Sequence, residues 1–304
     1  MQDSTRPLLS VIVAFHDMAR EAPRTLHTLS PRHQQGVNAA EYEVLAVDCG
    51  SSSPLSEALV RNCGPTFRLL RMGAAPSPAA SINAAVRASR GEAVMLLIDG
   101  ARMLTPGIVR LTLAALRAFP DPVVATLAWH LGPKLQNESL LEGYCQDVED
   151  RLLESVDWHR DGYELFRIAS LAASCSDGWF LPMSESNCLT VRRAGWDLLG
   201  GLDERFVTPG GGLVNLDFFR RACTALGPLV MLLGEGTFHQ FHGGVATNVP
   251  AASHPFAIFE AEYVRLRGEP FARPAGKPVI LGAMPPQALP FLVRSVDCLR
   301  GGAP

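Results

Sequence analysis

The alternation of buried strands with helices in the first 100 residues constrains this fold more than any other feature of the sequence. Four short runs of β-branched and aliphatic residues have the pattern of strands buried on both faces of a sheet. These runs cover residues 8–15, 42–47, 67–72 and 93–98, and helical patterns lie at residues 18–29 and 79–89. Such alternation is typical of an open, doubly wound sheet. We therefore predict an α/β fold built on a mostly parallel, Rossmann-like sheet.

Polar residues stand where three of these strands end. His16 and Asp17 follow the first strand, Asp48 follows the second, and Asp99 follows the fourth. Ligands of doubly wound sheets bind beyond the carboxyl ends of the strands. The sequence therefore predicts a ligand site at this edge, although an Asp before Gly also caps turns by bonding its own backbone.

Composition excludes several classes of function. The chain has 304 residues, with 27 Lys and Arg against 30 Asp and Glu, so it lacks the basic surface of a nucleic-acid-binding protein. Its seven cysteines are an odd number without a CxxC pair, which predicts reduced thiols and a cytoplasmic location. The apolar run at residues 278–293 is interrupted by prolines and is unsuited to span a bilayer as a helix. We expect neither nucleic acid nor integral membrane contact.

The pattern changes from about residue 130 onward. Residues 134–154 and 213–222 have helical patterns, and residues 229–233 have the pattern of a strand. The tail at residues 271–304 is rich in Pro and Gly, and we assign no element to it.

Five short motifs occur in a fixed order along the chain. They are Ser10–His16, Val47–Ser51, Asn83 with Gly91-Glu92, Leu96–Ala101 with Pro106-Gly107, and Gly200–Phe206. Together they resemble the GT-A fold of family 2 nucleotide-sugar glycosyltransferases, over roughly residues 8–245. The chain departs from that pattern at His16, where the family has Asn, and at Cys49 and Ala101, where it has acids.

The resemblance implies transfer of a hexosyl unit from a UDP- or GDP-sugar to a hydroxyl acceptor, either a carbohydrate or a small molecule. It implies one domain over residues 1–270, with a nucleotide-sugar-binding half at 1–128 and an acceptor half at 129–270. The alternative is a catalytically silent relative that only binds nucleotide sugars, because several acids are replaced. We expect a cytoplasmic, bacterial protein and leave a homodimer open.

The resemblance also implies the residues of the donor site. Phe15 would flank the base, Asp48 would accept its N–H groups, and Asn83 and Asp99 would complete the nucleotide-sugar site. Asp99 is the retained first acid of the Asp-x-Asp motif, and with His239 and His242 it would hold Mn²⁺ or Mg²⁺. Ala101 cannot coordinate a metal. Either Asp99 and other ligands hold the cation, or the phosphates are neutralised differently.

Catalysis is where the sequence departs most from the family. Inverting relatives begin a helix with an acid pair, and aligning the Arg of that motif with Arg221 places Asn215 where the general base would stand. Asn215 has no site that accepts a proton at neutral pH. Either Asp217 or Glu185 serves as the base, or the enzyme retains configuration and the leaving diphosphate accepts the proton. We favour retention, with Asn215 orienting the sugar, because it requires no missing residue.

Overall fold

A computed structural model describes residues 6–301 of the chain. Its centre is a mixed sheet whose main path follows the order β10-β9-β6-β8-β4-β1-β2-β3, with β5 paired to β9 and β7 paired to β6. The strands are β1 Leu9–Phe15, β2 Tyr42–Cys49, β3 Phe67–Met72, β4 Ala93–Leu97, β5 Arg102–Leu104, β6 Val123–Leu131, β7 Ala169–Leu171, β8 Leu189–Arg192, β9 Leu229–His239 and β10 Val279–Gly282. The α-helices are α1 Ala22–Leu29, α2 Glu57–Cys63, α3 Ala79–Ala88, α4 Ile108–Ala118, α5 Gln136–Ser139, α6 Gln146–Glu154, α7 Arg193–Leu199, α8 Val214–Ala225, α9 Phe256–Arg267 and α10 Leu289–Leu299.

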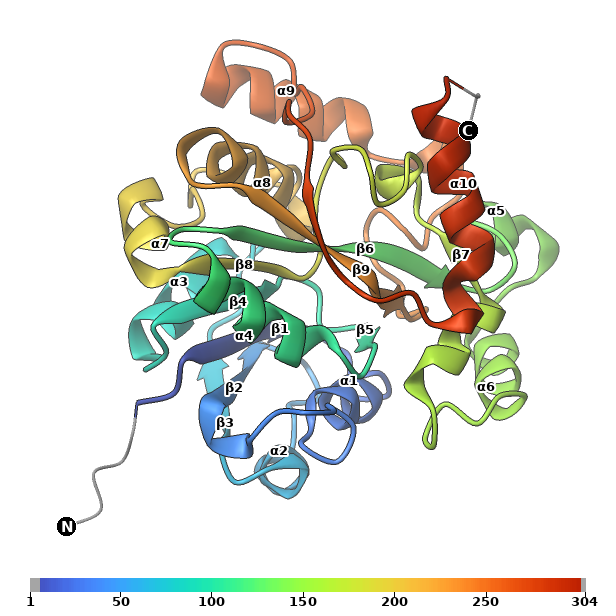
Figure 1. Ribbon diagram of the computed structural model, residues 1–304. Coiled ribbons are helices and arrows are strands. Elements are labelled where there is room, and N and C mark those ends of the chain that lie inside the picture. Colours follow the sequence, from blue (N-terminus) through green and yellow to red (C-terminus); the bar gives the residue numbers. More distant parts are fainter. Residues whose placement is uncertain (1–5, 302–304) are drawn as a thin grey trace.

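The first half confirms the predicted doubly wound arrangement. Strand β1 pairs in parallel with both β2 and β4, and β2 pairs in parallel with β3. Successive residues of β1 alternate between two apolar cores: Ile12 packs in the core that contains α3, and Val13 packs in the core that contains α1, α2 and α4. Helices therefore cover both faces of the sheet (Figure 1), and this explains why the strands are apolar at almost every position.

The second half contains elements that the sequence analysis did not assign. Strand β8 runs antiparallel to both β4 and β6, while β5 and β7 add short antiparallel pairs. The single helix expected at residues 134–154 is wrong. A break separates α5 from α6, because Gly143 adopts a left-handed backbone conformation with φ of 87° that ends the first helical segment.

Strand β9 extends further than its apolar run predicts. It continues past Leu233 through Gly234, whose φ is 74°, and ends at His239. The first half of β9 pairs with β10, and the last three residues pair with β5. This extension carries a histidine to the edge of the sheet where the carboxyl ends of β1, β2 and β4 lie.

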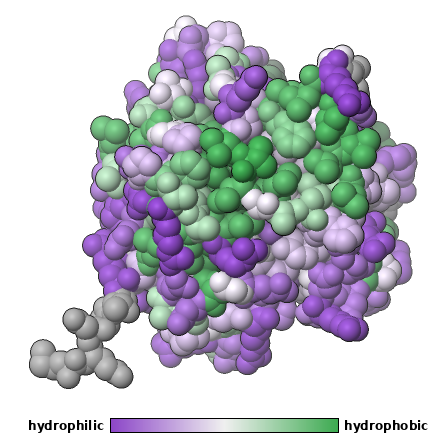
Figure 2. Space-filling model, in the orientation of Figure 1, coloured by the Kyte–Doolittle hydropathy of each residue, from purple (hydrophilic) through white to green (hydrophobic). Residues whose placement is uncertain are grey.

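The tail after residue 270 adds structure to the sheet. Strand β10 pairs in parallel with β9, and α10 packs Phe291 and Leu292 against the core. Hydrophobic side chains gather on the face where β10 and α10 lie (Figure 2). Val279 in β10 and Leu289 and Val293 in α10 are exposed. All seven cysteines are free. No helix within residues 6–301 has both the length and the hydrophobicity needed to cross a bilayer.

Candidate functional site

Three side chains predicted to bind a metal lie close together in the structure. Asp99 lies two residues beyond β4, His239 is the last residue of β9, and His242 lies in the loop that follows. The Nε2 atom of His239 is 2.9 Å from Asp99 Oδ2 and 3.2 Å from His242 Nε2. One ligand atom from each residue lies within 4.8 Å of the others, so the three form a candidate metal centre.

Gln136, the first residue of α5, fixes the proton on His239. Its Nε2 donates to the His239 carbonyl oxygen at 3.0 Å, which orients the amide and turns Oε1 toward His239 Nδ1 at 2.6 Å. His239 Nδ1 therefore carries the hydrogen, and Nε2 presents a lone pair to the Asp99 carboxylate. Two facing lone pairs repel unless a cation lies between them, so this donor set fits a divalent ion.

The pKa shifts of His239 and Asp99 give the charges of this centre. Burial lowers the pKa of His239 to about 4 despite the nearby Asp99, so the imidazole is neutral at physiological pH. Burial opposes charge on Asp99, but His242, His239 and Arg102 together hold the pKa of that carboxyl well below its usual range. The site therefore offers one carboxylate and neutral imidazole, the protonation states that metal binding requires.

Asn248 shapes the loop that carries His242. Its Oδ1 accepts the backbone N–H groups of His242, Gly243 and Gly244, each at 3.0 Å. Its Nδ2 donates to Gln136 Oε1 at 2.9 Å, so the same side chain connects the loop to the residue that orients His239. Asn248 therefore holds the two histidines in one arrangement.

The expected base site lies at the ends of β1 and β2. Asp48 is 2% exposed, and its two carboxylate oxygens accept the backbone N–H groups of Ser51 and Leu55 at 2.9 and 2.8 Å. Burial alone would raise the pKa of Asp48, but these donors outweigh it and lower that pKa. Asp17, a non-glycine residue with a positive φ of 51°, accepts from the Ser52 backbone and hydroxyl groups. Two carboxylates thus fix the loop at residues 50–55.

Phe15 and Asn83 have different surroundings from those that the resemblance implies. Phe15 is fully buried, and a Cβ on Gly100 would lie 2.3 Å from its ring, so the ring has no free face for a base. Phe15 is a core residue, as its place in an apolar strand also suggests. Asn83 is buried. Its side-chain amide donates to the Leu202 carbonyl oxygen and to Glu204, and it accepts from the Leu202 backbone N–H. Its role in the structure is to hold the turn at residues 200–206.

The expected catalytic residues divide into two groups. Glu185 lines a cavity of about 190 Å³ beside the candidate metal centre, and its Oε2 accepts from Asn215 Nδ2 at 2.8 Å. Asp217, in contrast, is 1% exposed and accepts hydrogen bonds from Arg221 and Arg267. Its two oxygens are held in ion pairs away from the cavity, so its geometry is that of a structural residue.

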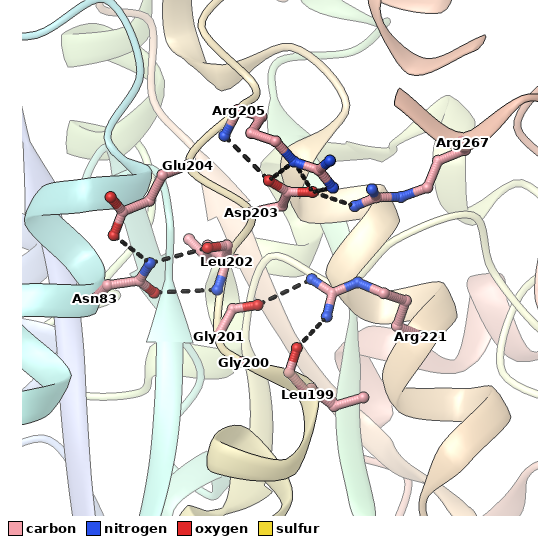
Figure 3. Close-up of a pocket in the computed structure, with 10 residues that line it drawn as sticks. All are labelled: Asn83, Leu199, Gly200, Gly201, Leu202, Asp203, Glu204, Arg205, Arg221 and Arg267. Carbon is pink, nitrogen blue, oxygen red and sulfur yellow. Dashed lines mark hydrogen bonds and ion pairs between the residues drawn. The ribbon is translucent and has the colours of Figure 1, made fainter. Parts of the chain in front are cut away.

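A larger hollow of about 540 Å³ (Figure 3) is lined by Arg221 and Arg267, the two arginines that pair with Asp217. Arg267 bonds Asp203 there, and Arg221 donates to the carbonyl oxygens of Leu199 and Gly201. The charged side chains that Figure 3 labels are paired with one another, with the backbone or, in the case of Glu204, with the Asn83 side-chain amide. The larger hollow is therefore surrounded by an ion-pair network around the turn at residues 200–206. The smaller cavity is lined by Arg102, whose Nη2 atom lies 3.4 Å from Asp99 Oδ2.

Sequence reasoning missed three residues of this site. Gln136 has no local signal, because His239 lies 103 residues away in the chain. Asn248 bonds the nearby loop at residues 242–244, but its bond to Gln136 spans 112 residues. Arg102 was visible as a basic residue directly after Ala101, where the strand-end motif lacks its second acid. Its side chain lines the smaller cavity.

The fold that carries this site is that of known glycosyltransferases. The structure of S. aureus TarS 1–349 in complex with UDP-GlcNAc matches with a TM-score of 0.53 at 13% identity, covering 84% of this chain and 66% of that chain. Another TarS 1–349 structure matches with a TM-score of 0.51 at 12% identity, covering 76% and 60%. A mannosyltransferase from Pyrobaculum calidifontis in complex with GDP-Man and Mn²⁺ has a TM-score of 0.47 at 19% identity, covering 97% and 71%.

The chain thus spans 60% of the first TarS fragment. At these identities the likeness concerns the fold alone. No protein-family model and no curated protein matches the sequence.

Proposed function

We propose that this chain is a family 2 GT-A glycosyltransferase that moves a hexosyl unit from a UDP- or GDP-sugar to a hydroxyl acceptor. One observation carries the proposal: Asp99, His239 and His242 converge at the carboxyl edge of a sheet with a glycosyltransferase fold. Donors that carry a diphosphate need positive charge at the leaving group, and a cation held by these three residues would supply it. Two imidazole ligands favour Mn²⁺ over Mg²⁺, which prefers a shell of oxygen atoms.

The nucleoside would lie against the loop at residues 50–55. Asp48 and Asp17 hold this loop rigidly, and each Asp48 oxygen keeps lone pairs beyond the one backbone donor that it accepts. Base recognition by Asp48 stays a proposal, supported by its place at the end of β2. The buried Phe15 has no part in it.

For the chemical step we propose retention of configuration. Asn215 cannot accept a proton, and Asp217 is committed to two arginines. The leaving diphosphate then accepts the proton of the acceptor hydroxyl. Glu185 would contact that hydroxyl from the cavity wall, with its carboxylate oriented by the Asn215 amide.

The test is transfer or slow hydrolysis of a panel of UDP- and GDP-sugars with Mn²⁺ and with EDTA. We expect sugar release that depends on the cation and is lost in Asp99→Ala, and NMR of the first product should show the anomeric configuration of the donor. An inverted product would overturn retention and assign Glu185 as the base. Tight binding of a donor with neither hydrolysis nor transfer would identify a silent nucleotide-sugar-binding protein instead.

A further inference from the structure

Arg102 has an unusual environment for a charged side chain. It is 5% exposed, begins β5, and stands opposite His239 in the β5–β9 pair. Its Nη2 atom is 3.4 Å from Asp99 Oδ2, whereas its Nε and Nη1 atoms have no hydrogen-bond partner within residues 6–301. Arginine stays charged in proteins, and burying unpaired N–H donors costs free energy. A fold keeps such a group at a cost unless a ligand satisfies it.

The cavity beside Arg102 presents further donors. Arg102 and His130 both line this cavity of about 190 Å³, together with Asn137, Ser174, Asn187, Thr247 and the carboxylate of Glu185. His130 Nδ1 accepts from the Gln136 backbone N–H at 3.0 Å, so its Nε2 atom carries the proton of the neutral ring. The volume is several times the roughly 30 Å³ that one water molecule occupies in the liquid, so a phosphate group fits.

The charge of the candidate metal centre indicates which anion would bind in this cavity. A donor sugar carries a negative charge on each of its two phosphates. A divalent cation on the candidate metal centre loses half of its charge to Asp99, which leaves one negative charge of the diphosphate uncompensated. Arg102 supplies the missing positive charge, and its planar fork matches two phosphate oxygens.

We propose that Arg102 binds the diphosphate of the donor and, with the divalent cation, neutralises the charge that remains once Asp99 is counted. The inference rests on the proposed function and adds to it a specific phosphate-binding residue. The buried, partly unpaired guanidinium facing a cavity next to Asp99 is the observation that carries it.

Calorimetric titration of UDP, GDP, uridine, guanosine and inorganic pyrophosphate, each with Mn²⁺, tests this assignment. Arg102→Met should weaken the affinity for the preferred nucleoside diphosphate by at least about tenfold and leave the nucleoside affinity unchanged. Arg102→Lys should recover part of the loss, because it keeps the charge without the fork. Arg205→Met is the matched control: it removes an exposed arginine from the larger hollow and should bind as the wild type does.

Thermal unfolding of the ligand-free proteins separates binding from a structural role. Because Nη2 of Arg102 has one weak ion pair, with Asp99 at 3.4 Å, and its Nε and Nη1 atoms have no partner within residues 6–301, Arg102→Met should melt close to the wild-type temperature. Two results would overturn the inference and leave the proposed function intact. One is a clearly lower melting temperature of Arg102→Met, and the other is that Arg102→Met binds UDP and GDP as tightly as the wild type does. If pyrophosphate binds in an Arg102-dependent way but neither nucleotide binds, Arg102 is an anion-binding residue and the proposal that the donor is a UDP- or GDP-sugar is overturned. A wild-type protein that binds none of these probes would overturn both.

Discussion

At the scale of single residues, the candidate metal centre depends on an amide that touches no metal. Gln136 Oε1 holds the hydrogen on His239 Nδ1, so the opposite nitrogen presents its lone pair toward Asp99 and His242. Partners that fix the tautomer of a metal-binding histidine have a large effect on affinity. The geometry of this centre is therefore determined as much by α5, which begins at Gln136, as by the strand that carries His239.

Gln136→Leu should weaken Mn²⁺ binding by roughly 10- to 100-fold, because His239 loses the acceptor that selects its tautomer. Isothermal titration of Mn²⁺ in the presence of UDP or GDP measures the change. Gln35→Leu makes the same substitution at an exposed glutamine and should have no effect. Equal Mn²⁺ affinity in Gln136→Leu and wild type would show that the amide does not control this histidine.

Asp217 is expected to matter for stability and not for the chemical step. Its carboxylate is buried between Arg221 and Arg267, so Asp217→Asn removes the charge that both arginines face. We expect a loss of about 3 kcal/mol in the free energy of unfolding, measured with urea. The rate per folded molecule should change little. Asp197→Asn, on the exposed side of α7, is the control for stability. A large fall in kcat with unchanged stability would instead identify Asp217 as the general base.

At the scale of elements, two buried titratable side chains connect neighbouring segments. His33, in the turn after α1, contacts the carbonyl oxygen of Leu104 in β5 at 2.9 Å. Glu149, in α6, accepts the backbone N–H of Phe241 at 2.6 Å and pairs with Arg20. Burial lowers the pKa of His33 to about 4 and raises the pKa of Glu149 to about 7. Both groups are therefore uncharged in the folded protein over much of the mildly acidic range.

These two groups should give opposite dependences of stability on pH. As pH falls from about 6.5 to 4, the unfolded chain protonates His33 before the folded protein does, so stability is lost toward acid. As pH rises from 4.5 to about 7, the unfolded chain loses the Glu149 proton first, so stability is lost toward neutrality. Each effect is on the order of 3 kcal/mol, and in the wild type they largely cancel.

Urea unfolding at pH 5, 6 and 7 checks this balance. Relative to wild type, Glu149→Gln should gain stability as pH rises, and His33→Gln should lose it. Profiles that run parallel to the wild type would show that these side chains titrate in the same way in the folded and unfolded chains.

At the scale of the whole molecule, the first half could be predicted from sequence because its strands are buried on both faces. Residues such as Ile12 and Val13 contact opposite cores, so β1 is recognisable as an unbroken apolar run. The second half mixes parallel and antiparallel pairs, and its strands carry polar residues such as His130 and His239 within them. Local hydrophobic patterns do not show those pairings.

The sequence predicts only part of the candidate site, because some of its residues have local signals and others depend on distant contacts. Asp99, His239 and His242 stand beside strand ends or glycines, and such positions are visible in a sequence. The ion pair between Asp217 and Arg221 was also visible as an i,i+4 spacing, but the second partner of Asp217, Arg267, lies 50 residues further on. Contacts between distant segments decide which carboxylates face solvent and which are structural, and no periodic pattern records them.

The pairing of β10 with β9 also affects solubility. Val230, Met231 and Leu232 are fully buried in the half of β9 that β10 covers. A chain that stopped at residue 270 would leave this apolar strand with unpaired backbone groups along one side, which is a template for strands from other molecules. Light scattering should then show aggregates where the longer chain stays dispersed. The Pro- and Gly-rich segment thus has a protective role, because it shields a strand edge that would otherwise promote aggregation.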